Sequence, residues 1–328
     1  MANRSGGRIR SISYAKYGYI FILPFFLVYV VFQLYPLFNT FYLSFFGNGS
    51  TKEEWVGLSN YQRLLFGGAD RVASSVHETF LRVLGNTFVL WVGNFIPQII
   101  LSLVLAAWFT NARLKIPGKG AYKIIMYMPN IITAASSAAL FVTLFGDSKF
   151  GAVNAMLINN GIIDALHPIQ FVSGPTQARI MIMIIQTWMW YGNTTIMLMS
   201  GIMGINGSLF EAASIDGASH TQQFFKITLP LLKPILLYTV VTSMIGGLQM
   251  FDIPALYNNG TSQNSATETI AVYIYDNFLN ANLSNYGNAA SASVILFMIT
   301  SILGSICFAI NRDKDVKHKK SKKTSKLL

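Results

Sequence analysis

Six long apolar stretches decide what this chain can fold into. They cover residues 19–46, 83–109, 122–145, 180–203, 234–257 and 289–310. About 20 helical residues cross a hydrocarbon core of about 30 Å, so each stretch is long enough to span a bilayer. Only helices and closed barrels satisfy their backbone hydrogen bonds in lipid, and these stretches lack the period-two alternation of barrel strands. The sequence therefore predicts an all-α integral membrane protein with six transmembrane helices.

The charge content supports a membrane location. Charged residues make up 11% of the 328 residues, whereas a soluble domain carries about 25%. The 24 Lys and Arg cluster between the apolar stretches rather than on one soluble face, so we expect no nucleic-acid partner. The single cysteine, Cys307, excludes an intramolecular disulfide. The four histidines share no ligand spacing, so no metal site is expected.

The basic residues also predict the orientation. Most of them lie in segments 1–16, 111–123, 204–233 and 311–328, which fall on one side of the membrane. Basic loops favour the cytoplasmic side, so we expect a multi-pass protein of the cell membrane with both termini cytoplasmic. The first stretch is too long for a signal-peptide core and ends without a cleavage site, so it should remain as a spanning helix.

The predicted spans divide the chain into four parts. They are a basic cytoplasmic tail (1–16), the first transmembrane helix with an extracellular loop (17–82), a transmembrane core (83–311) and a second basic tail (312–328). The second tail should contact anionic membrane lipid.

Two extracellular segments lie within that core. In the first, residues 151–166 are apolar on one side and too short to span, so they predict an amphipathic helix at the membrane surface. The second, residues 258–288, is rich in Asn, Ser and Thr and predicts a solvated loop with a short helical piece.

The segment 211–230, EAASIDGASHTQQFFKITLP, is the most informative one. Good helix formers follow two possible N-caps, Asn206 and Ser208, and Gly217 provides a helix end. An amphipathic piece follows, and Pro230 and Pro234 start the next span. We expect a short helix held across the inner membrane surface, exposing small side chains to a partner.

The spacing of this segment resembles the signature loop of binding-protein-dependent ABC importer permeases. The resemblance implies the type I ABC importer permease fold, in which a short cytoplasmic coupling helix sits in a cleft of a separate ATPase subunit. The implied coupling residues are Glu211, Ala212, Ala213, Asp216, Gly217, Ile227, Leu229 and Pro230.

The resemblance extends over almost the whole chain and points to the carbohydrate branch, maltose and oligosaccharide type. GLSNYQRLL from Gly57 and ATETIAVYIYDNF from Ala266 are similar to that branch. Two places depart from it: Gly192 stands where many relatives carry proline, and Asn259-Gly260-Thr261 stands where a Gly-Gly-Pro turn is common.

The same resemblance implies the partners. They are a second, homologous permease subunit forming a heterodimer, two copies of an ABC ATPase, an extracellular solute-binding lipoprotein and a sugar substrate. The chain itself should not be an enzyme and should bind no cofactor, because Gly118-Lys119-Gly120 lacks the upstream glycine and the Ser or Thr of a phosphate-binding loop. ATP and Mg would be bound by the partner ATPase.

A sugar site is expected on the fourth apolar stretch. A midplane site needs hydrogen-bonding groups and an aromatic face, and polar and aromatic residues recur there at offsets of three, four and seven on one helical side. An aromatic packing layer of Trp188, Trp190 and Tyr191 stays open as the alternative. Matching to the maltose-type permease implies eight pathway residues: Gln186, Met189, Trp190, Asn193, Ser243, Gly246, Gly247 and Met250.

Three of these, Gly246, Gly247 and Met250, replace polar or aromatic groups of the maltose-type permease. The replacements imply a different or larger sugar, or contact made mainly by the partner permease. Asp252 is costly at membrane depth, and we expect it to make a structural hydrogen bond rather than to relay protons.

Two other functions remain open at this point. One is an ABC permease for a non-sugar solute, such as a glycerol phosphodiester or a polyol. The other is a different class, a proton-coupled secondary transporter or a membrane-embedded enzyme. The absence of converging ionisable residues in the spans weighs against that second class.

Overall fold

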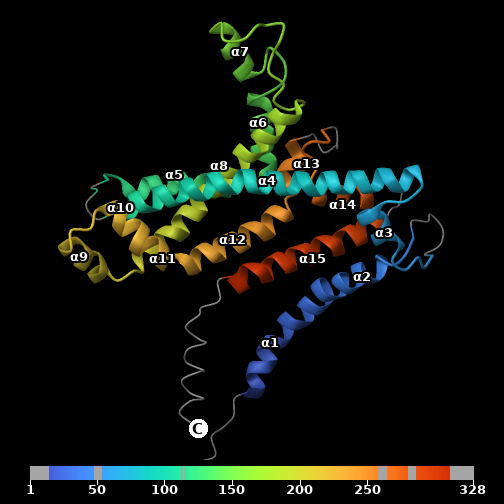
Figure 1. Cartoon of the computed structure of the whole chain (residues 1–328), viewed down its shortest axis with the longest axis horizontal. Coiled ribbons are helices and arrows are strands. Elements are labelled where there is room, and N and C mark those ends of the chain that lie inside the picture. Colours follow the sequence, from blue (N-terminus) through green and yellow to red (C-terminus); the bar gives the residue numbers. More distant parts are fainter. Residues whose placement is uncertain are drawn as a thin grey trace, which may run out of the picture.

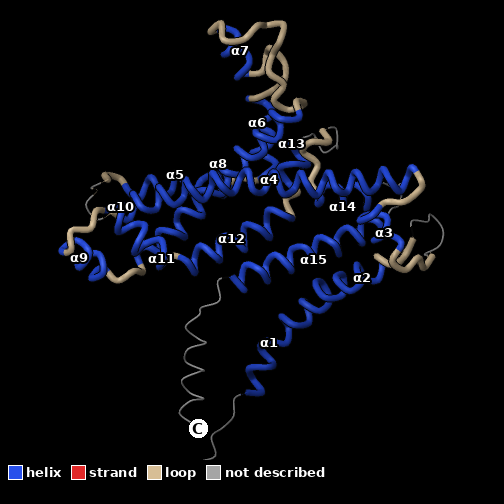
Figure 2. Tube along the Cα trace, viewed as in Figure 1, coloured by secondary structure: helices blue, strands red, loops and turns tan. Residues whose placement is uncertain are grey.

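The computed structural model describes residues 15–47, 54–111, 114, 116–257, 264–279 and 286–310. These residues form helices joined by loops (Figures 1 and 2), and within them the only strand-like pairing is one bridge between Phe46 and Trp55. Nearly all of the first tail, the whole of the second tail and the Asn259-Gly260-Thr261 departure lie outside the described residues.

The first span consists of α1 (Ala15–Tyr29), a π-helical turn η1 (Val30–Leu34) and α2 (Tyr35–Leu43). Pro36 has no N–H to donate, and just before it the Tyr35 N–H donates to the Val30 carbonyl five residues back. No residue of the most apolar window of this span is buried within the chain. Only its second half, α2, packs against the last helix, and α1 diverges from the bundle (Figure 1).

The second span, α4 (Arg71–Thr110), is longer than predicted. Asp70 caps it by accepting a hydrogen bond from the Val72 N–H at 3.3 Å. The predicted boundary between residues 82 and 83 therefore falls inside a continuous helix. The charged residues of 71–82 indicated a loop, but Phe80 on the same helix is fully buried and anchors this turn in the core.

A sharp bend interrupts the third predicted span, and another follows the fourth. The helices α5 (Lys119–Ile131) and α6 (Ala134–Leu144) meet at 93°. The long helix α8 (Pro175–Met203) meets α9 (Gly207–Ile215) at 70°. Among the described residues, four stretches are long and apolar enough to span alone: Tyr17–Leu43, Arg71–Thr110, Lys233–Tyr257 and Tyr286–Ile310. Six spans result when each bent pair is counted as one span. The all-α, six-span prediction is thus confirmed.

The fifth span is also interrupted. It comprises α12 (Lys233–Leu248) and α13 (Asp252–Tyr257), with three non-helical residues between them. The last two described helices are α14 (Ile270–Leu279) and α15 (Tyr286–Ile310), which pack on each other and on α4 or α12.

The two segments predicted to be extracellular differ in part from their predictions. The helix α7 covers only Ala152–Asn159, because the chain turns at Gly161 with a positive φ of 68°. It projects from the bundle together with α6 (Figure 1). In the described part of segment 258–288, the predicted short helical piece is confirmed as α14. The predicted solvated loop was wrong there, since Thr267, Thr269 and Ile270 are fully buried.

The remaining elements are short. The helix α3 (Ser59–Phe66) packs on α4. Between α9 and α12 lie α10 (His220–Gln223), the π-helical turn η2 (Phe224–Thr228) and α11 (Leu229–Leu231).

The core is built around the contact between α4 and α8. Four hydrogen bonds between described residues cross it: Thr187 to the Asn94 carbonyl at 3.1 Å, Gln98 to Thr194 at 2.7 Å, Ser102 to the Tyr191 carbonyl at 2.9 Å, and Arg179 to the Asn86 side chain at 2.7 Å. On another side of α8, Gly192 lets α5 approach closely.

Gly192 therefore has a packing explanation. A Cβ added at this position would overlap the Met126 backbone carbonyl of α5. The glycine that replaces the proline of many relatives suits this close crossing of α5 and α8, because the crossing leaves no room for a side chain at position 192.

Candidate functional site

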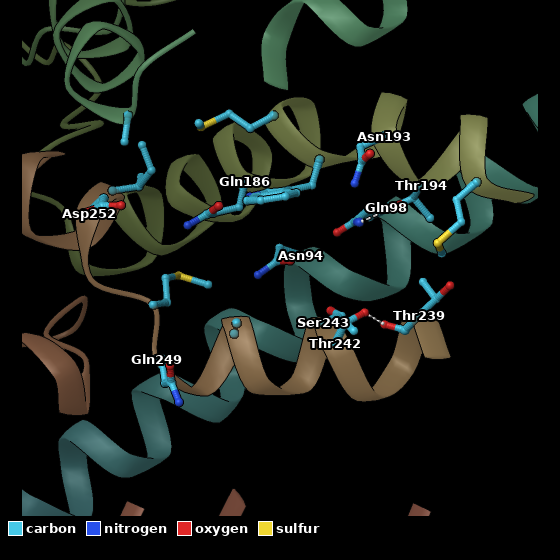
Figure 3. A pocket seen from close by; sticks show the side chains of 18 of the residues that line it. Asn94, Gln98, Gln186, Asn193, Thr194, Thr239, Thr242, Ser243, Gln249 and Asp252 are labelled. Carbon is cyan, nitrogen blue, oxygen red and sulfur yellow. Dashed lines mark hydrogen bonds between the residues drawn. The ribbon is translucent and has the colours of Figure 1, made fainter. Parts of the chain in front are cut away.

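A cavity of about 590 Å³ opens between α4, α8, α12 and the break before α13 (Figure 3). Its walls combine amide and hydroxyl groups with Met, Trp and Tyr side chains. It is lined by Asn94, Gln98, Ala134, Gln186, Met189, Trp190, Asn193, Thr194, Ile196, Met197, Tyr238, Thr239, Thr242, Ser243, Gly246, Gly247, Gln249, Met250, Phe251, Asp252 and Ile253.

All eight residues predicted for the substrate pathway line this cavity. The α8 stripe, with its offsets of three, four and seven, faces it as a unit, because those offsets return to one side of a helix. Trp190 is 46% exposed and Gln186 is 9% exposed. The structure thus brings the predicted residues together, while their contact with a sugar stays a prediction.

The aromatic residues of α8 divide between two roles. Trp188 packs edge-to-face on Phe141 of α6, with ring centroids 5.5 Å apart. Tyr191 packs against a separate apolar cluster that includes Met199. Trp190 alone of these three lines the cavity. The packing-layer alternative therefore holds for Trp188 and Tyr191, whereas Trp190 lines the cavity and its role in the substrate pathway stays a prediction.

The two adjacent glycines of α12 also differ. A Cβ on Gly246 would meet nothing within 4 Å, so this glycine widens the cavity. A Cβ on Gly247 would overlap the Trp91 indole of α4, so this glycine serves packing. The same indole donates from Nε1 to the Ser243 hydroxyl at 3.2 Å. Ser243 is therefore already engaged inside the chain.

The α4 residues that line the cavity were not predicted from the sequence. Asn94 and Gln98 line the cavity from α4, and Ser102 continues the same face one turn on. Polar residues four apart in an otherwise apolar span mark one helical face, and this signal was present in the sequence. The additional polar lining also includes Thr194, Tyr238, Thr239, Thr242 and Gln249.

Asp252 lies where the chain re-enters a helix after the break. It is exposed, it lines the cavity, and it is the first residue of α13 (Figure 3). Within the described part of the chain it has no hydrogen-bond or ion-pair partner. The predicted structural hydrogen bond was therefore wrong for these residues, and the carboxylate faces the cavity instead.

A second feature is the α9 loop, residues 204–231. Asn206 caps α9 by accepting from the Ser208 N–H at 3.1 Å. Gly217 has a φ of 80°, and the Ala218 N–H returns to the Ala213 carbonyl at 2.8 Å, which ends the helix in a Schellman motif. The predicted helix, its N-cap and its glycine end are confirmed.

The second half of the α9 loop folds back on the first. Ser219 and Gln222 form a capping box at the start of α10. The buried side chain of Gln223 donates to the Ser214 hydroxyl at 3.0 Å and to the Ala218 carbonyl at 3.2 Å. These two bonds fix the angle between α9 and α10, so the loop is a defined body.

The α9 loop leaves its helix open to solvent. No residue of α9 is buried, and Ile215 is 86% exposed. Of the predicted coupling residues, five are exposed and three are partly buried. The exposed ones are Glu211, Ala212, Asp216, Gly217 and Pro230, and the partly buried ones are Ala213, Ile227 and Leu229.

A third feature was not predicted. Residues 264–270, here the hub segment, are bound by side chains from α4 and α8. Asn86 donates to the Ser265 and Glu268 carbonyls at 2.8 and 3.0 Å. Arg179 donates to the Ala266 carbonyl and to the Asn86 side chain, both at 2.7 Å. The hub segment therefore ties the N-terminal parts of α4 and α8 together.

The hub segment also reaches the cavity. The Thr269 hydroxyl donates to the carbonyl of Met250, a cavity residue, at 2.7 Å. Glu268 pairs with Arg82 at 3.1 Å. Burial raises the pKa of the Glu268 carboxyl, and the Arg82 guanidinium opposes that shift.

Comparison with known proteins identifies the family. Residues 1–313 match the family described as "Binding-protein-dependent transport system inner membrane component". The lactose transport system permease protein LacF of Rhizobium radiobacter is 30% identical over 90% of this chain and 94% of its own length. The trehalose/maltose permease MalF of Thermococcus litoralis is 31% identical over 87% and 90%. The arabinooligosaccharides permease AraP of Bacillus subtilis is 27% identical over 94% and 93%.

Solved structures share the fold. A chain of a bacterial alginate ABC transporter, in complex with an alginate pentasaccharide-bound periplasmic protein, superposes with a TM-score of 0.74 at 22% identity. That match covers 91% of this chain and 94% of the other. A second chain, from an ABC transporter that imports the acidic polysaccharide alginate, gives 0.75 at 24%, covering 90% and 95%. This chain therefore belongs to the binding-protein-dependent transport system inner membrane component family.

Proposed function

We propose that the chain is one permease subunit of an ATP-driven importer of saccharides. The cavity forms its half of the translocation pathway, and the α9 loop couples it to a separate ATPase. One observation carries the proposal: α8 runs without interruption from the cavity residues to Met203, and α9 begins four residues later. A displacement of α9 would thus be transmitted along one helix to the cavity.

The exposure of α9 supports a docking role. A nine-residue helix without tertiary packing is marginally stable in water, and α9 buries none of its residues. Its caps and the Gln223 bonds hold its shape, while Glu211 and Asp216 have no partner among the described residues. An ATPase cleft would cover this helix and supply donors to the two carboxylates.

ATP binding would be coupled to transport because the ATPase would contact the α9 loop differently in its two states. A ligand shifts a conformational equilibrium only when it contacts the two states differently. ATP and Mg would bind the ATPase pair, whose closure would carry α9 as a rigid lever. The other proposed partners are a homologous permease subunit, forming a heterodimer, and an extracellular solute-binding protein, which the family description supports.

The cavity chemistry suits a saccharide. Trp190 offers a half-exposed indole against which a pyranose ring can stack, and Gln186, Asn193 and Asn94 offer amides. Convergent polar groups beside an aromatic face are the usual composition of such sites. The three relatives compared above are named for lactose, arabino-oligosaccharides and trehalose or maltose. They give no support to a non-sugar solute or to proton coupling.

Membrane orientation is part of the proposal. The α9 loop and both termini would face the cytoplasm, because the positive charge of the sequence gathers on that side. Cysteines placed at Ala212 should then react with an impermeant reagent in inverted vesicles and not in intact cells.

Transport and docking are tested together. The purified subunits, reconstituted in vesicles with the binding protein, should take up sugar only when ATP is supplied on the α9 side. An Ala212→Cys variant should crosslink to the ATPase, whereas a cysteine at the lipid-facing Phe26 should not. Uptake driven by a proton gradient without ATP would overturn the proposal.

A further inference from the structure

One residue sets the charge of the cavity. Asp252 is the only charged side chain among the residues that line it, and all the others are neutral. The nearest basic residue along α8, Arg179, is bound to Asn86 and the Ala266 carbonyl and does not line the cavity. Within the described residues, therefore, the Asp252 carboxylate faces the cavity without a compensating cation.

The break in the fifth span places this carboxylate. The helix α12 ends at Leu248, and residues 249–251 turn the chain before α13 begins at Asp252. Asp252, Gln249 and Gln186 lie toward the same end of the cavity (Figure 3). Gln186 is buried and has no hydrogen bond to a described residue, so its amide is available to a solute beside Asp252.

A carboxylate without a compensating cation interacts strongly with charged solutes in a cavity of this kind. Charges near low-dielectric walls interact several times more strongly than in bulk water, and a cleft of one sign concentrates the opposite sign. Recognition that must reject a competitor does so through a repulsive group as well as through attractive ones. A carboxylate in a neutral cavity is such a group toward an anion.

We propose that Asp252 is a charge filter, which admits uncharged and cationic saccharides to this cavity and excludes acidic ones such as uronates. Its relevance to saccharides rests on the proposed function. Among neutral sugars it would accept a hydrogen bond from a hydroxyl group, and toward a carboxylated sugar it would act by repulsion. The same fold serves a transporter of the acidic polysaccharide alginate, so the fold alone does not fix this selection.

Charged thiol reagents test the filter without reference to any sugar. In a Cys307→Ala background, Gly246→Cys places a thiol where nothing lies within 4 Å. The modification rates of a trimethylammonium-ethyl and a sulfonato-ethyl methanethiosulfonate are measured on the detergent-purified transporter. Gly207→Cys on exposed α9, where an added Cβ also meets nothing, is the matched control.

The expected result is a change of ratio at one site only. The cation-to-anion rate ratio at Gly246→Cys should fall about tenfold when Asp252→Asn is added, as expected for removing one nearby charge at moderate ionic strength. Asp252→Glu should keep the ratio, and Gly207→Cys should show no change with either variant. An unchanged ratio at Gly246→Cys in Asp252→Asn would overturn the filter, whether or not the transporter imports sugars.

Uptake measurements give a second, separate test of the filter. If the complex shows ATP-dependent uptake, Asp252→Asn should raise uptake of an acidic oligosaccharide relative to its neutral counterpart. The expected fall of the thiol ratio in Asp252→Asn, together with no ATP-dependent uptake by the parent complex, would reject the proposed function and keep the filter. An altered thiol ratio with unaltered sugar preference would overturn the filter as a determinant of saccharide selection.

Discussion

The α9 loop and the hub segment both connect helices, but they are stabilised in opposite ways. The α9 loop is held by its own caps and by Gln223, with every residue of α9 left unburied. The hub segment buries Thr267, Glu268 and Thr269 and is bound by side chains of α4 and α8. The α9 loop keeps its shape through its own hydrogen bonds and leaves α9 exposed. The hub segment is stabilised only by its contacts with the helix bundle.

This difference predicts different roles for the two segments. A self-capped, exposed helix can move as a body and bind another chain, because few contacts tie it to its own domain. A buried segment that satisfies polar groups of several helices fixes their relative positions, because each lost bond leaves an unpaired buried group. Variants in the first should alter coupling, and variants in the second should alter stability.

The largest effect is expected at the end of α9. Gly217→Asp adds a side chain and a charge to the proposed docking face, at a φ of 80° that costs L-residues about 1 kcal/mol. ATP-driven uptake should fall to background, while membrane insertion and the melting temperature of the complex stay close to those of the parent. Gly207→Ala, on the same exposed helix and without a positive φ, should transport normally. Normal uptake by Gly217→Asp vesicles would refute the coupling assignment.

The hub segment should give the largest loss of stability. Asn86→Ala removes two donors to the hub carbonyls and the acceptor of Arg179. Unpaired buried groups cost about 1–3 kcal/mol each, so a total of about 3 kcal/mol is expected, read as a lower melting temperature of the detergent-purified complex. If the melting temperature is unchanged, these bonds do not hold the N-terminal parts of α4 and α8 together.

The close crossing on α8 lies between the two regions and should give an intermediate effect. Gly192→Ala forces α5 away from α8, because the added methyl overlaps the Met126 carbonyl. Overpacking of this kind costs about 1–3 kcal/mol, again seen as a lower melting temperature. Gly246→Ala, which adds the same methyl in open space, is the control and should melt like the parent. Equal melting of all three proteins would exclude a tight crossing.

Local sequence signals predicted the features that depend on local physics. Span number follows from the length of apolar runs, and the α9 helix follows from Asn206 at one end and Gly217 at the other. Both are properties of neighbouring residues, and the structure confirms them. The pathway stripe of α8 is likewise a periodicity within one helix.

The features that were missed depend on distant residues. Asn86 and Ser265 are 179 positions apart, and Arg82 and Glu268 are 186 apart. Taken alone, residues 71–82 and 264–269 are polar, so both were interpreted as loops in water. They are ordered because each satisfies the other. The free carboxylate of Asp252 was missed for the same reason, since only the fold shows what surrounds it.

The smallest effect is expected for loss of the N-cap of α9, and it tests directly whether α9 and the hub segment differ. Asn206→Ala makes the same chemical change as Asn86→Ala, but it removes a single exposed cap bond to Ser208. Loss of an N-cap costs about 1 kcal/mol, and here it falls on a helix that the rest of the chain does not cover. Amide hydrogen exchange in α9 should therefore rise about fivefold, while the melting temperature of the complex stays unchanged. A global loss of stability like that of Asn86→Ala would show that α9 is part of the cooperative core, and the distinction between the two regions would fail.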